Sequence, residues 1–558
     1  MRCAILLKAY AADATRVASA FLSERLTRTL QIEAPETDLP AETSAGGGAP
    51  LARGGVMNEE NTDGRRTVAV VGAGIAGLAA GVYAQQSGFD VHVFERNDEP
   101  GGATIGWERD GYRFEGGAHW VPGTADRTSF NALWREVGAL DDEVAVKLPD
   151  PYFAYESDGR VALLFRDPKR LRAHLTELAP EDAREIKRLC RDVARFTKVD
   201  LPFGDVKGVK AKHPLESNPF TAASMMPAFT RMPSYAKQDV SSLLNCFRSP
   251  LIRGLLSCIA GENESATSLV STLAQFAAGD GGYPEGGSAG MAKRMALRFE
   301  ELGGSLRFGA PVERVVVKDG IATGVIAGGE VQSFDAVIVA QDTIASAFSL
   351  FDPPLDKPWV HTMLSATKPQ TGMVVGVGVA ADLGELPESI GFSPAEPLQI
   401  AGRSFSEITL CNFAAYEGLA PEGCTALTVS LPGDTYDWWR EREAAGVYSE
   451  EKRLVAERVI AALEERFPPL AGNVKTWEVA TPLSFERRLH SYRGSWMSIL
   501  RPSTNVSPHS AKPQGIANLY FAGQRMLLPG GMVNALKTGR IAVQYLCKDT
   551  RTVFQNEI

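Results

Sequence analysis

The chain reads Thr67-Val-Ala-Val-Val-Gly-Ala-Gly-Ile-Ala-Gly77 at its first strongly apolar segment. Its first five residues are β-branched or small and too few for a helix, so they predict a strand. The glycines lead into Leu78 to Ser87, which has the composition of a helix. A second strand is predicted from Val91 to Phe94, and Glu95 follows it. The order strand, tight turn, helix, strand predicts a βαβ unit with parallel strands.

The glycines of this turn have separate tasks. Gly72 permits the turn, Gly74 lets a pyrophosphate approach the backbone, and Gly77 lets the helix pack on the strand. Free N–H groups at the helix start favour a phosphate anion. Glu95 stands at the usual spacing for an acid that accepts two hydrogen bonds from a ribose diol. The motif therefore predicts dinucleotide binding, with mere close packing of strand and helix as the structural alternative.

The composition is that of an ordinary folded protein. Of 558 residues, 44% are hydrophobic and 22% charged, which excludes wholesale disorder and coiled coil. A net charge of −9 leaves no basic stripe for a nucleic acid. The seven cysteines are scattered, and the seven histidines form no H-E-x-x-H motif, so we expect no metal site and reduced thiols in the cytoplasm. No apolar run reaches the ~18 residues that a membrane span needs.

Residues 1–66 precede the first strand, and we predict that they form a flexible extension and linker. Glu33 to Arg66 is rich in Pro, Gly, Ala and acidic residues. Ala4 to Leu30 has a helical pattern with scattered arginines. Peripheral membrane contact and a dispensable extension both stay open for this segment, and we favour the second.

The middle of the chain changes character twice. Residues 150–271 are predicted to be mainly helical, and 346–476 to mix strands with a helix at Glu450 to Phe467. Gly376-Val-Gly378 imitates the first glycine motif, but Gly and Pro follow too soon for a crossover helix, so a strand is predicted there. One stretch is rich in large flexible side chains, which either line a pocket for an elongated ligand or form ordinary core: Met225, Met226, Phe229, Met232 and Phe247.

Three further segments carry a family resemblance: Glu95-Arg-Asn-Asp-Glu-Pro-Gly-Gly102, Tyr112 to Gly123, and Asn518 to Arg540. With the glycine motif they resemble the FAD-dependent amine oxidase and phytoene desaturase superfamily over about Thr67 to Cys547. The sequence is most similar to the branch of phytoene desaturases, carotenoid isomerases and retinol saturases, partly through Tyr283-Pro-Glu-Gly-Gly287.

The resemblance implies an α/β architecture, a Rossmann-like FAD-binding domain of the glutathione-reductase type with an inserted α+β substrate domain. The FAD-binding domain would comprise residues 67–149, 272–345 and 477–558. The substrate domain would comprise residues 150–271 and 346–476.

The resemblance also implies FAD contacts. Those at the pyrophosphate and adenosine would be Gly72, Gly74, Ile75, Ala76, Gly77, Glu95, Arg96 and, through its backbone, Val312. Those around the flavin and ribityl chain would be Gly101, Gly102, Gly117, Ala118, Trp120, Gly523, Gln524, Gly531, Met532 and Val533. Ala103 replaces an arginine common in the family, which weakens the amine oxidase reading. No cysteine precedes Cys547 in the C-terminal segment, so we expect non-covalent FAD.

Flavin chemistry requires few side chains, and His119, Tyr283 and Arg493 are the catalytic candidates. The leading hypothesis is an FAD-dependent oxidoreductase that desaturates, saturates or isomerises carbon–carbon bonds of an extended apolar substrate, isoprenoid or polyene. It would work with an electron acceptor or donor that no motif identifies. A flavin amine oxidase is the enzymatic alternative. A non-catalytic, prenyl-binding escort-type protein is the alternative of another class, and the intact motif with Glu95 argues against it.

Overall fold

The computed structural model describes residues 64–104, 106–116, 120–200, 204–213, 219–261, 264–500, 509–513, 515–527 and 530–557. The chain divides after Met57 into two units, and all described residues belong to the second, Asn58–Ile558. The predicted extension up to residue 63 lies outside the described residues.

A five-stranded parallel sheet has the order β23-β13-β1-β2-β9. Its strands are β1 (Thr67–Val71), β2 (Asp90–Phe94), β9 (Ser305–Arg307), β13 (Ala336–Val339) and β23 (Leu519–Phe521). Helix α2 (Ile75–Gln86) connects β1 to β2, which confirms the predicted βαβ unit. Strands from three separated parts of the sequence thus share one sheet.

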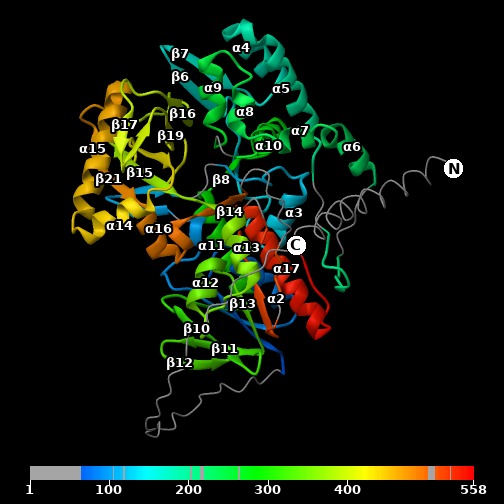
Figure 1. Ribbon diagram of the computed structural model, residues 1–558. Helices are drawn as coiled ribbons and strands as arrows, with labels where there is room; N and C mark the ends of the chain where they lie inside the picture. Colours follow the sequence, from blue (N-terminus) through cyan, green and yellow to red (C-terminus); the bar gives the residue numbers. More distant parts are fainter. Residues whose placement is uncertain are drawn as a thin grey trace, which may run out of the picture. The chain divides into compact units, whose positions relative to one another are not determined.

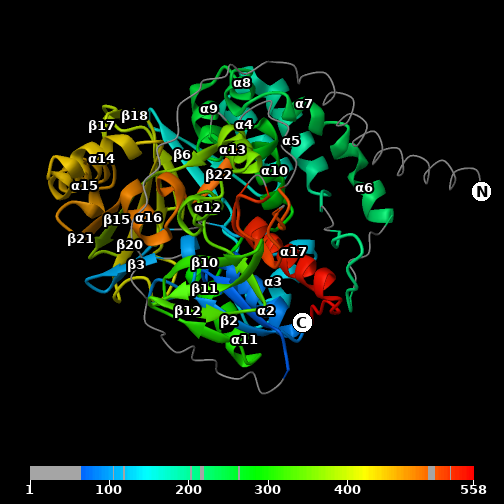
Figure 2. The same cartoon turned by 60° about the horizontal axis from the view of Figure 1, so that its bottom comes forward.

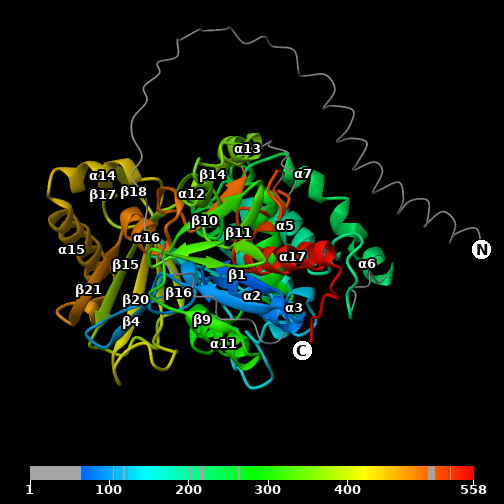
Figure 3. The same ribbon diagram turned by 90° about the horizontal axis from the view of Figure 1, so that it is seen from below.

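Alternate residues of β1 face opposite sides of this sheet, as the pleat requires. Val68 and Val70 pack against α2, α11 (Gly287–Glu301) and α17 (Met532–Thr550). Ala69 and Val71 face a second layer, made of β10 (Val312–Lys318), β11 (Ile321–Ala327), β12 (Glu330–Ser333), α12 (Thr343–Ser349) and α13 (Pro358–Ala366). Figure 3 shows the β10–β11 hairpin and α11 on opposite sides of β1.

A second, mostly antiparallel sheet has seven strands in the order β21-β15-β20-β19-β16-β6-β7. They are β6 (Phe153–Ser157), β7 (Arg160–Leu164), β15 (Gly372–Val379), β16 (Ser389–Phe392), β19 (Ile408–Asn412), β20 (Thr425–Pro432) and β21 (Val474–Ala480). Met373, Val375 and Val377 share an apolar core with residues of α14 (Tyr436–Ala444) and α15 (Tyr448–Arg466). Both helices lie beside this sheet in Figure 1.

The glycines of Gly376-Val-Gly378 lie within β15, so the predicted strand is confirmed. A Cβ at Gly376 would lie 2.4 Å from Cγ of Phe114, and one at Gly378 would lie 2.7 Å from Cγ of Tyr112. Both rings belong to β4 (Tyr112–Glu115), which pairs with β3 (Gly106–Arg109). The two glycines make room for these rings, which explains a glycine pattern without a nucleotide.

Residues 150–271 begin with two strands, β6 and β7, which lie at one edge of the second sheet. Helices follow from Pro168 onward, which confirms the prediction of a mainly helical region. Its helices are α4 (Pro168–Leu178), α5 (Ala183–Phe196), α6 (Pro219–Phe229), α7 (Met232–Ala236), α8 (Val240–Leu244), α9 (Pro250–Ser257) and α10 (Ala266–Ala277). In Figure 2, α6 lies at the edge of this group. Phe247 and Met225 are buried, whereas Met226 is 53% exposed.

Short elements complete the chain: η1 (Gly102–Thr104), α3 (Ser129–Glu136), β5 (Val146–Lys147), η2 (Pro180–Asp182), β8 (Tyr283–Pro284), β14 (Thr367–Gln370), β17 (Leu398–Ile400), β18 (Arg403–Phe405), η3 (Pro468–Leu470), α16 (Pro482–Leu489), η4 (Tyr492–Gly494) and β22 (Met497–Leu500). None of the described helices combines the length and apolarity needed to cross a bilayer.

Candidate dinucleotide site

The carboxyl ends of the central parallel strands meet at one edge of the first sheet. The Gly72 amide donates to the Phe94 carbonyl at 2.8 Å, which joins the ends of β1 and β2. The Ala522 amide donates to the Val339 carbonyl at 2.9 Å, which joins the ends of β23 and β13. Open α/β sheets bind ligands outside the carboxyl ends of their strands. This edge is therefore the candidate site.

The glycine motif has the predicted geometry. Gly72 has φ +99°, a conformation that favours glycine. A Cβ at Gly77 would lie 1.9 Å from the Gly72 carbonyl oxygen, so only glycine lets the helix start this close to the strand. Gly74 is the N-cap of α2 and makes no side-chain cap. The first N–H groups of α2, including those of Ile75 and Ala76, are thus not capped by a side chain and can bind phosphate.

Glu95 directly follows β2 and is almost completely buried. Its Oε2 accepts a hydrogen bond from the Ala73 amide at 2.8 Å. Its Oε1 accepts from the backbone amide of Asn97 at 2.9 Å and from Asn97 Nδ2 at 2.7 Å. The Ala310 amide donates to the Glu95 carbonyl at 2.8 Å, which brings the start of β10, at Val312, beside the acid. Sequence reasoning missed Asn97, whose position two residues after the acid was a usable signal.

Gly101 and Gly102 lie directly against the turn Gly72–Gly74, which is the proposed phosphate-binding turn. Gly101 forms an isolated parallel bridge with Gly74, and its amide donates to the Ala73 carbonyl at 2.9 Å. Gly102 has φ +59°, and a Cβ there would lie 3.1 Å from Gly74 Cα. The backbone approach requires glycine at this position. The extended motif is thus one contiguous surface, with the exposed Arg96 at its margin.

The C-terminal segment completes the edge. Gly523 has φ +131° and its amide donates to Thr538 Oγ1 at 2.8 Å. Gln524 Oε1 accepts from the Ser498 amide at 3.0 Å, so the carbonyl of this amide side chain already has a protein partner. Gly531, with φ +113°, is the N-cap of α17 and makes no side-chain cap. The first turn of α17, with Met532 and Val533, therefore offers backbone N–H groups as the first turn of α2 does.

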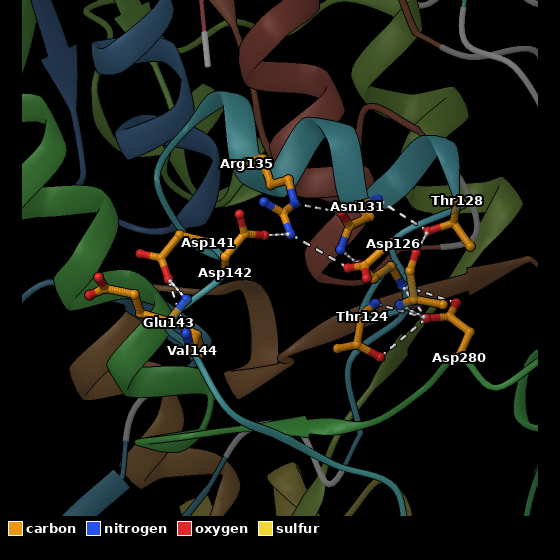
Figure 4. A network of polar contacts seen from close by, with 12 residues as sticks. Thr124, Asp126, Thr128, Asn131, Arg135, Asp141, Asp142, Glu143, Val144 and Asp280 are labelled. Atoms are coloured by element: carbon orange, nitrogen blue, oxygen red, sulfur yellow. Dashed lines mark hydrogen bonds and ion pairs between the residues drawn. The ribbon is translucent and has the colours of Figure 1, made fainter.

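Gly117, Ala118 and His119 lie outside the described residues, but the loop that follows them is held tightly. The Asp280 carboxylate accepts backbone hydrogen bonds from Gly123, Thr124 and Ala125 at 2.9, 2.8 and 3.1 Å. Figure 4 shows Asp280 and Thr124 next to the start of α3. The Val121 amide also donates to Gly282 at 2.9 Å. Two segments that the sequence singled out separately are thus joined.

The same network extends along α3 (Figure 4). Asn131 Nδ2 donates to the Gly123 carbonyl at 3.0 Å, and Asn131 Oδ1 accepts from Arg135 Nε at 2.9 Å. Arg135 also contacts Asp142 at 2.7 Å, and hydrogen bonding to that carboxylate raises the pKa of the guanidinium. Gly123 is therefore held from both sides, which fixes the path of the loop that begins at Trp120.

Two catalytic candidates are described in the structure. Tyr283 is buried, and its hydroxyl lies beside the carboxyl of Glu115. Burial and the neighbouring Glu115 raise the pKa of Tyr283 well above its ordinary value. Arg493 instead contacts Asp434 and Asp437 at 3.2 and 2.7 Å, in the turn before α14 and on that helix. These ion pairs give Arg493 a structural task, and its catalytic role stays a prediction.

A buried ion pair that sequence reasoning missed supports the C-terminal segment. Arg525 Nε lies 2.5 Å from Asp342 Oδ2, and the pair is nearly inaccessible to solvent. The other guanidinium nitrogens donate to Ser495 and Ser498. Asp342 follows β13 and caps α12 through the Ala345 amide. Since the two charges are 183 residues apart in sequence, no local pattern could pair them.

The chain matches the family model of flavin-containing amine oxidoreductases over residues 75–547 and belongs to that family. It is a flavin-dependent oxidoreductase, with FAD as its cofactor. The site agrees with this class of enzyme. One edge of the parallel sheet is surrounded by two glycine segments, by two helix N-termini without side-chain caps and by a buried acid.

Several curated proteins are similar over most of their length. A phytoene desaturase (lycopene-forming) from Pseudescherichia vulneris is 26% identical over 86% of this chain and 100% of its own. An all-trans-retinol 13,14-reductase from Danio rerio is 23% identical over 85% of both chains. A chloroplastic prolycopene isomerase from Daucus carota is 24% identical over 76% of this chain and 71% of its own.

Solved structures share the fold. Putrescine oxidase bound to putrescine superposes with a TM-score of 0.58 and 20% identity, covering 87% of this chain and 99% of its own. Cyclohexylamine oxidase from Brevibacterium oxydans superposes with a TM-score of 0.55 and 17% identity, covering 87% of this chain and 100% of its own. The mixed α/β fold is thus that of flavin-dependent amine oxidases.

Proposed function

We propose that this oxidoreductase acts on carbon–carbon bonds of an extended apolar substrate, an isoprenoid or polyene, by desaturation, saturation or cis–trans isomerisation. The observation that carries the proposal is the similarity, over 85% or more of the chain, to a phytoene desaturase and a retinol reductase.

The chain's own groups have defined tasks in this proposal. The first turn of α2 and the glycines beside it would bind the pyrophosphate, and Glu95 the ribose. The first turn of α17 would stabilise negative charge at the pyrimidine end of the flavin. Bound FAD would supply hydride acceptance or donation. His119, preceding the loop held by Asp280, is proposed as an acid or base near the reacting carbons, and Tyr283 as a nearby hydroxyl.

We also propose a Rossmann-like FAD-binding domain with an inserted substrate domain, on the evidence of the two separate sheets. The parallel sheet takes its strands from 67–149, 272–345 and the C-terminal segment. The predicted boundary at 477 falls inside β21, which belongs to the second sheet, so we place this boundary after Ala480.

Two groups of aromatic rings, one around Phe276 and one around Tyr283, favour an apolar substrate. One group stacks Phe276 on Tyr152, with ring centroids 4.1 Å apart, and places Trp120 5.5 Å from Phe276. The other packs Tyr283 4.8 Å from Tyr416. Trp120 and Tyr416 are half-buried and can offer apolar surface to a ligand, whereas the other three rings are buried behind them in the core.

An amine oxidase is the second candidate, favoured by the solved structures that share the fold. One contact argues against it. The Arg166 guanidinium lies 5.3 Å from the Phe276 ring centroid and 5.7 Å from that of Tyr152. These rings already face a cation. An ammonium substrate placed there would meet like charge, whereas a neutral polyene would not.

The test is an anaerobic incubation of the purified flavoprotein with polyenes and, separately, with amines. We expect changed double bonds in a polyene by liquid chromatography and no bleaching of the flavin band by putrescine. Bleaching by amines, without any reaction of a polyene, would establish the amine oxidase instead.

We further propose peripheral membrane contact through α6 and α7. No acidic residue occurs from Pro219 to Gln238, although the chain has a net charge of −9. Met226 on α6 is 53% exposed. Lys207, Lys210 and Lys212, shortly before α6, are exposed. An apolar helix near basic residues is suited to an anionic lipid surface.

Flotation with anionic vesicles tests this contact. Met226→Asp should reduce the bound fraction, whereas Leu297→Asp, a change at a residue 58% exposed on α11, should not. Equal loss in both variants, or no flotation of the parent protein, would contradict contact through α6.

A further inference from the structure

An acidic residue outside the predicted site is buried at the end of β4. Glu115 has 0% of its surface exposed. Its carboxyl lies between the end of η1, the first turn of α11 and Tyr283 of β8. Because β4 leads directly into residues 116–120, the group that fixes Glu115 also fixes the start of the segment proposed to face the flavin.

Ser288 faces this carboxyl with two groups, its backbone amide and its hydroxyl. The hydroxyl has to serve two neighbours. Ser288 Oγ lies 3.1 Å from Glu115 Oε2 and 3.1 Å from the Thr104 carbonyl oxygen. A serine hydroxyl has one proton, and a carbonyl only accepts. If Ser288 donates to Thr104, its contact with Glu115 needs a proton on the carboxyl. Both contacts are satisfied together when Glu115 is a neutral acid that donates to Ser288.

The other carboxyl oxygen lies beside Tyr283. A Cβ at Gly287 would be 2.3 Å from Tyr283 Oη and 3.0 Å from Glu115 Oε1, so both atoms fill the space that glycine leaves. Among the described residues, neither atom has a hydrogen-bond partner. The phenol lies beside Oε1 and is the hydroxyl that could donate to it, and donation would lower the pKa of Glu115.

The charged and titratable surroundings favour a neutral carboxyl. Burial raises the pKa of Glu115, and contacts with Ser288, Arg113 and Tyr283 offset this only in part. Arg113, on β4 itself, is the basic group that acts on Glu115. On the far side, the titratable groups that act on Tyr283 are Tyr416 and Cys411, both of which would add negative charge if ionised.

We propose that Glu115 is a positioning residue: a buried, neutral carboxylic acid beside Tyr283 that connects, through the Ser288 hydroxyl, to the Thr104 carbonyl and so holds β4, η1 and α11 together. Only the consequence for FAD rests on the proposed function. Thr104 ends η1, whose Gly102 lies against the phosphate-binding turn. If Glu115 ionised, its carboxylate and the Thr104 carbonyl would both need the single hydroxyl proton of Ser288. The contact between β4, η1 and α11 would then weaken.

Infrared spectroscopy tests the protonation directly. At neutral pH the parent protein should show the carbonyl-stretch band of a buried carboxylic acid, and Glu115→Gln should remove it. Glu300→Gln, at an exposed position of α11, should leave the band unchanged. A band that persists in Glu115→Gln, or is absent from the parent, would overturn the proposal. If Glu115→Gln does not fold, Ser288→Ala must shift the band, because the acid loses its acceptor.

The pH dependence of thermal stability gives a second test. An unfolded Glu ionises near about pH 4.3, whereas the native carboxyl stays protonated to higher pH. The native state therefore binds more protons, and the contribution of Glu115 to stability falls as the pH rises through its native pKa. Relative to the parent, Glu115→Gln should gain melting temperature as the pH rises above the pKa of an unfolded Glu, until the native carboxyl has ionised. If the difference in melting temperature between variant and parent stays constant or decreases as the pH rises, the proposal that Glu115 is a neutral acid is wrong.

FAD binding tests the positioning role. Glu115→Gln keeps a donor and an acceptor, so its FAD dissociation constant should stay within roughly twofold, whereas that of Glu115→Ala should rise roughly tenfold. Equal affinities for both variants would overturn positioning. If the parent itself binds no FAD, the proposed function fails, while the infrared and stability results still decide the state of Glu115.

Discussion

The backbone amide of Ala73, in the turn after β1, donates a hydrogen bond of 2.8 Å to Oε2 of Glu95, after β2. The acid and the phosphate-binding turn are therefore one rigid unit before any ligand binds. A carboxylate has about four lone-pair sites, and Ala73 and Asn97 already donate to three of them. The ribose should thus donate one hydrogen bond to Glu95, and not the two expected from the sequence.

Glu95→Ala should weaken FAD binding more than it changes catalysis at saturating FAD. A hydrogen bond to a charged group contributes on the order of 1.5–3 kcal/mol, so the dissociation constant should rise roughly tenfold or more. Flavin fluorescence titration measures it. Asn97→Ala, which only releases the carboxylate, should have a smaller effect, and Asp98→Ala, an exposed neighbour, none. Unchanged affinity in Glu95→Ala would place the ribose elsewhere.

Gly77→Ala should destabilise the fold and abolish FAD binding, because its Cβ would lie 1.9 Å from the Gly72 carbonyl oxygen. Overpacking of this kind costs about 1–3 kcal/mol, more than the ~1 kcal/mol that alanine gains over glycine in a helix. Thermal melts and FAD titration check both parts. Gly204→Ala, at an exposed position where a Cβ meets nothing within 4 Å, is the control for the change to alanine itself. Normal FAD affinity in Gly77→Ala would contradict the tight turn.

Asp280→Ala should release the loop after Trp120, since three backbone amides lose their acceptor. Unpaired buried donors cost about 1–3 kcal/mol each, and rearrangement will recover part, so we expect a loss on the order of 3 kcal/mol by chemical denaturation. FAD affinity should fall with it. Asp280→Asn keeps one acceptor and should lose less; equal stability of all three proteins would show that the loop holds itself.

FAD should be bound without a covalent link. Cys547 is the cysteine of the C-terminal segment, and it is fully buried on α17. Burial raises the pKa of its thiol to about 11, so the reactive thiolate is disfavoured. Acid precipitation should leave the yellow chromophore in the supernatant. Colour that stays with the unfolded pellet would disprove the prediction.

Lys537, in the second turn of α17, should make stability depend on alkaline pH. Burial lowers the pKa of its ammonium to about 8. Above this pH the unfolded chain binds more protons than the native state, so the stability contribution of Lys537 rises until about pH 10.4. Relative to Lys537→Met, the parent should gain melting temperature over this range. A constant difference would contradict the lowered pKa.

The sequence alone determined the βαβ unit, because its signals are local. The strand from Thr67 to Val71 follows from a short apolar run, and Gly72, Gly74 and Gly77 from the steric needs of a turn that leads at once into a helix. The family resemblance added Gly101, Gly102 and the C-terminal segment. The βαβ unit has the predicted backbone conformation, whereas the FAD contacts of these residues stay predictions.

Only the tertiary structure decided which distant residues meet. Asp280 and Gly123, Arg525 and Asp342, and Glu115 and Ser288 are pairs whose partners are far apart in sequence, so no periodicity or motif links them. The glycines of β15 also show that local spacing does not reveal tertiary contacts. Their spacing imitates a nucleotide-binding motif, but they are required because the rings of Tyr112 and Phe114 pack against them. Local sequence fixes backbone conformation, whereas burial and the pairing of polar groups depend on which segments pack together.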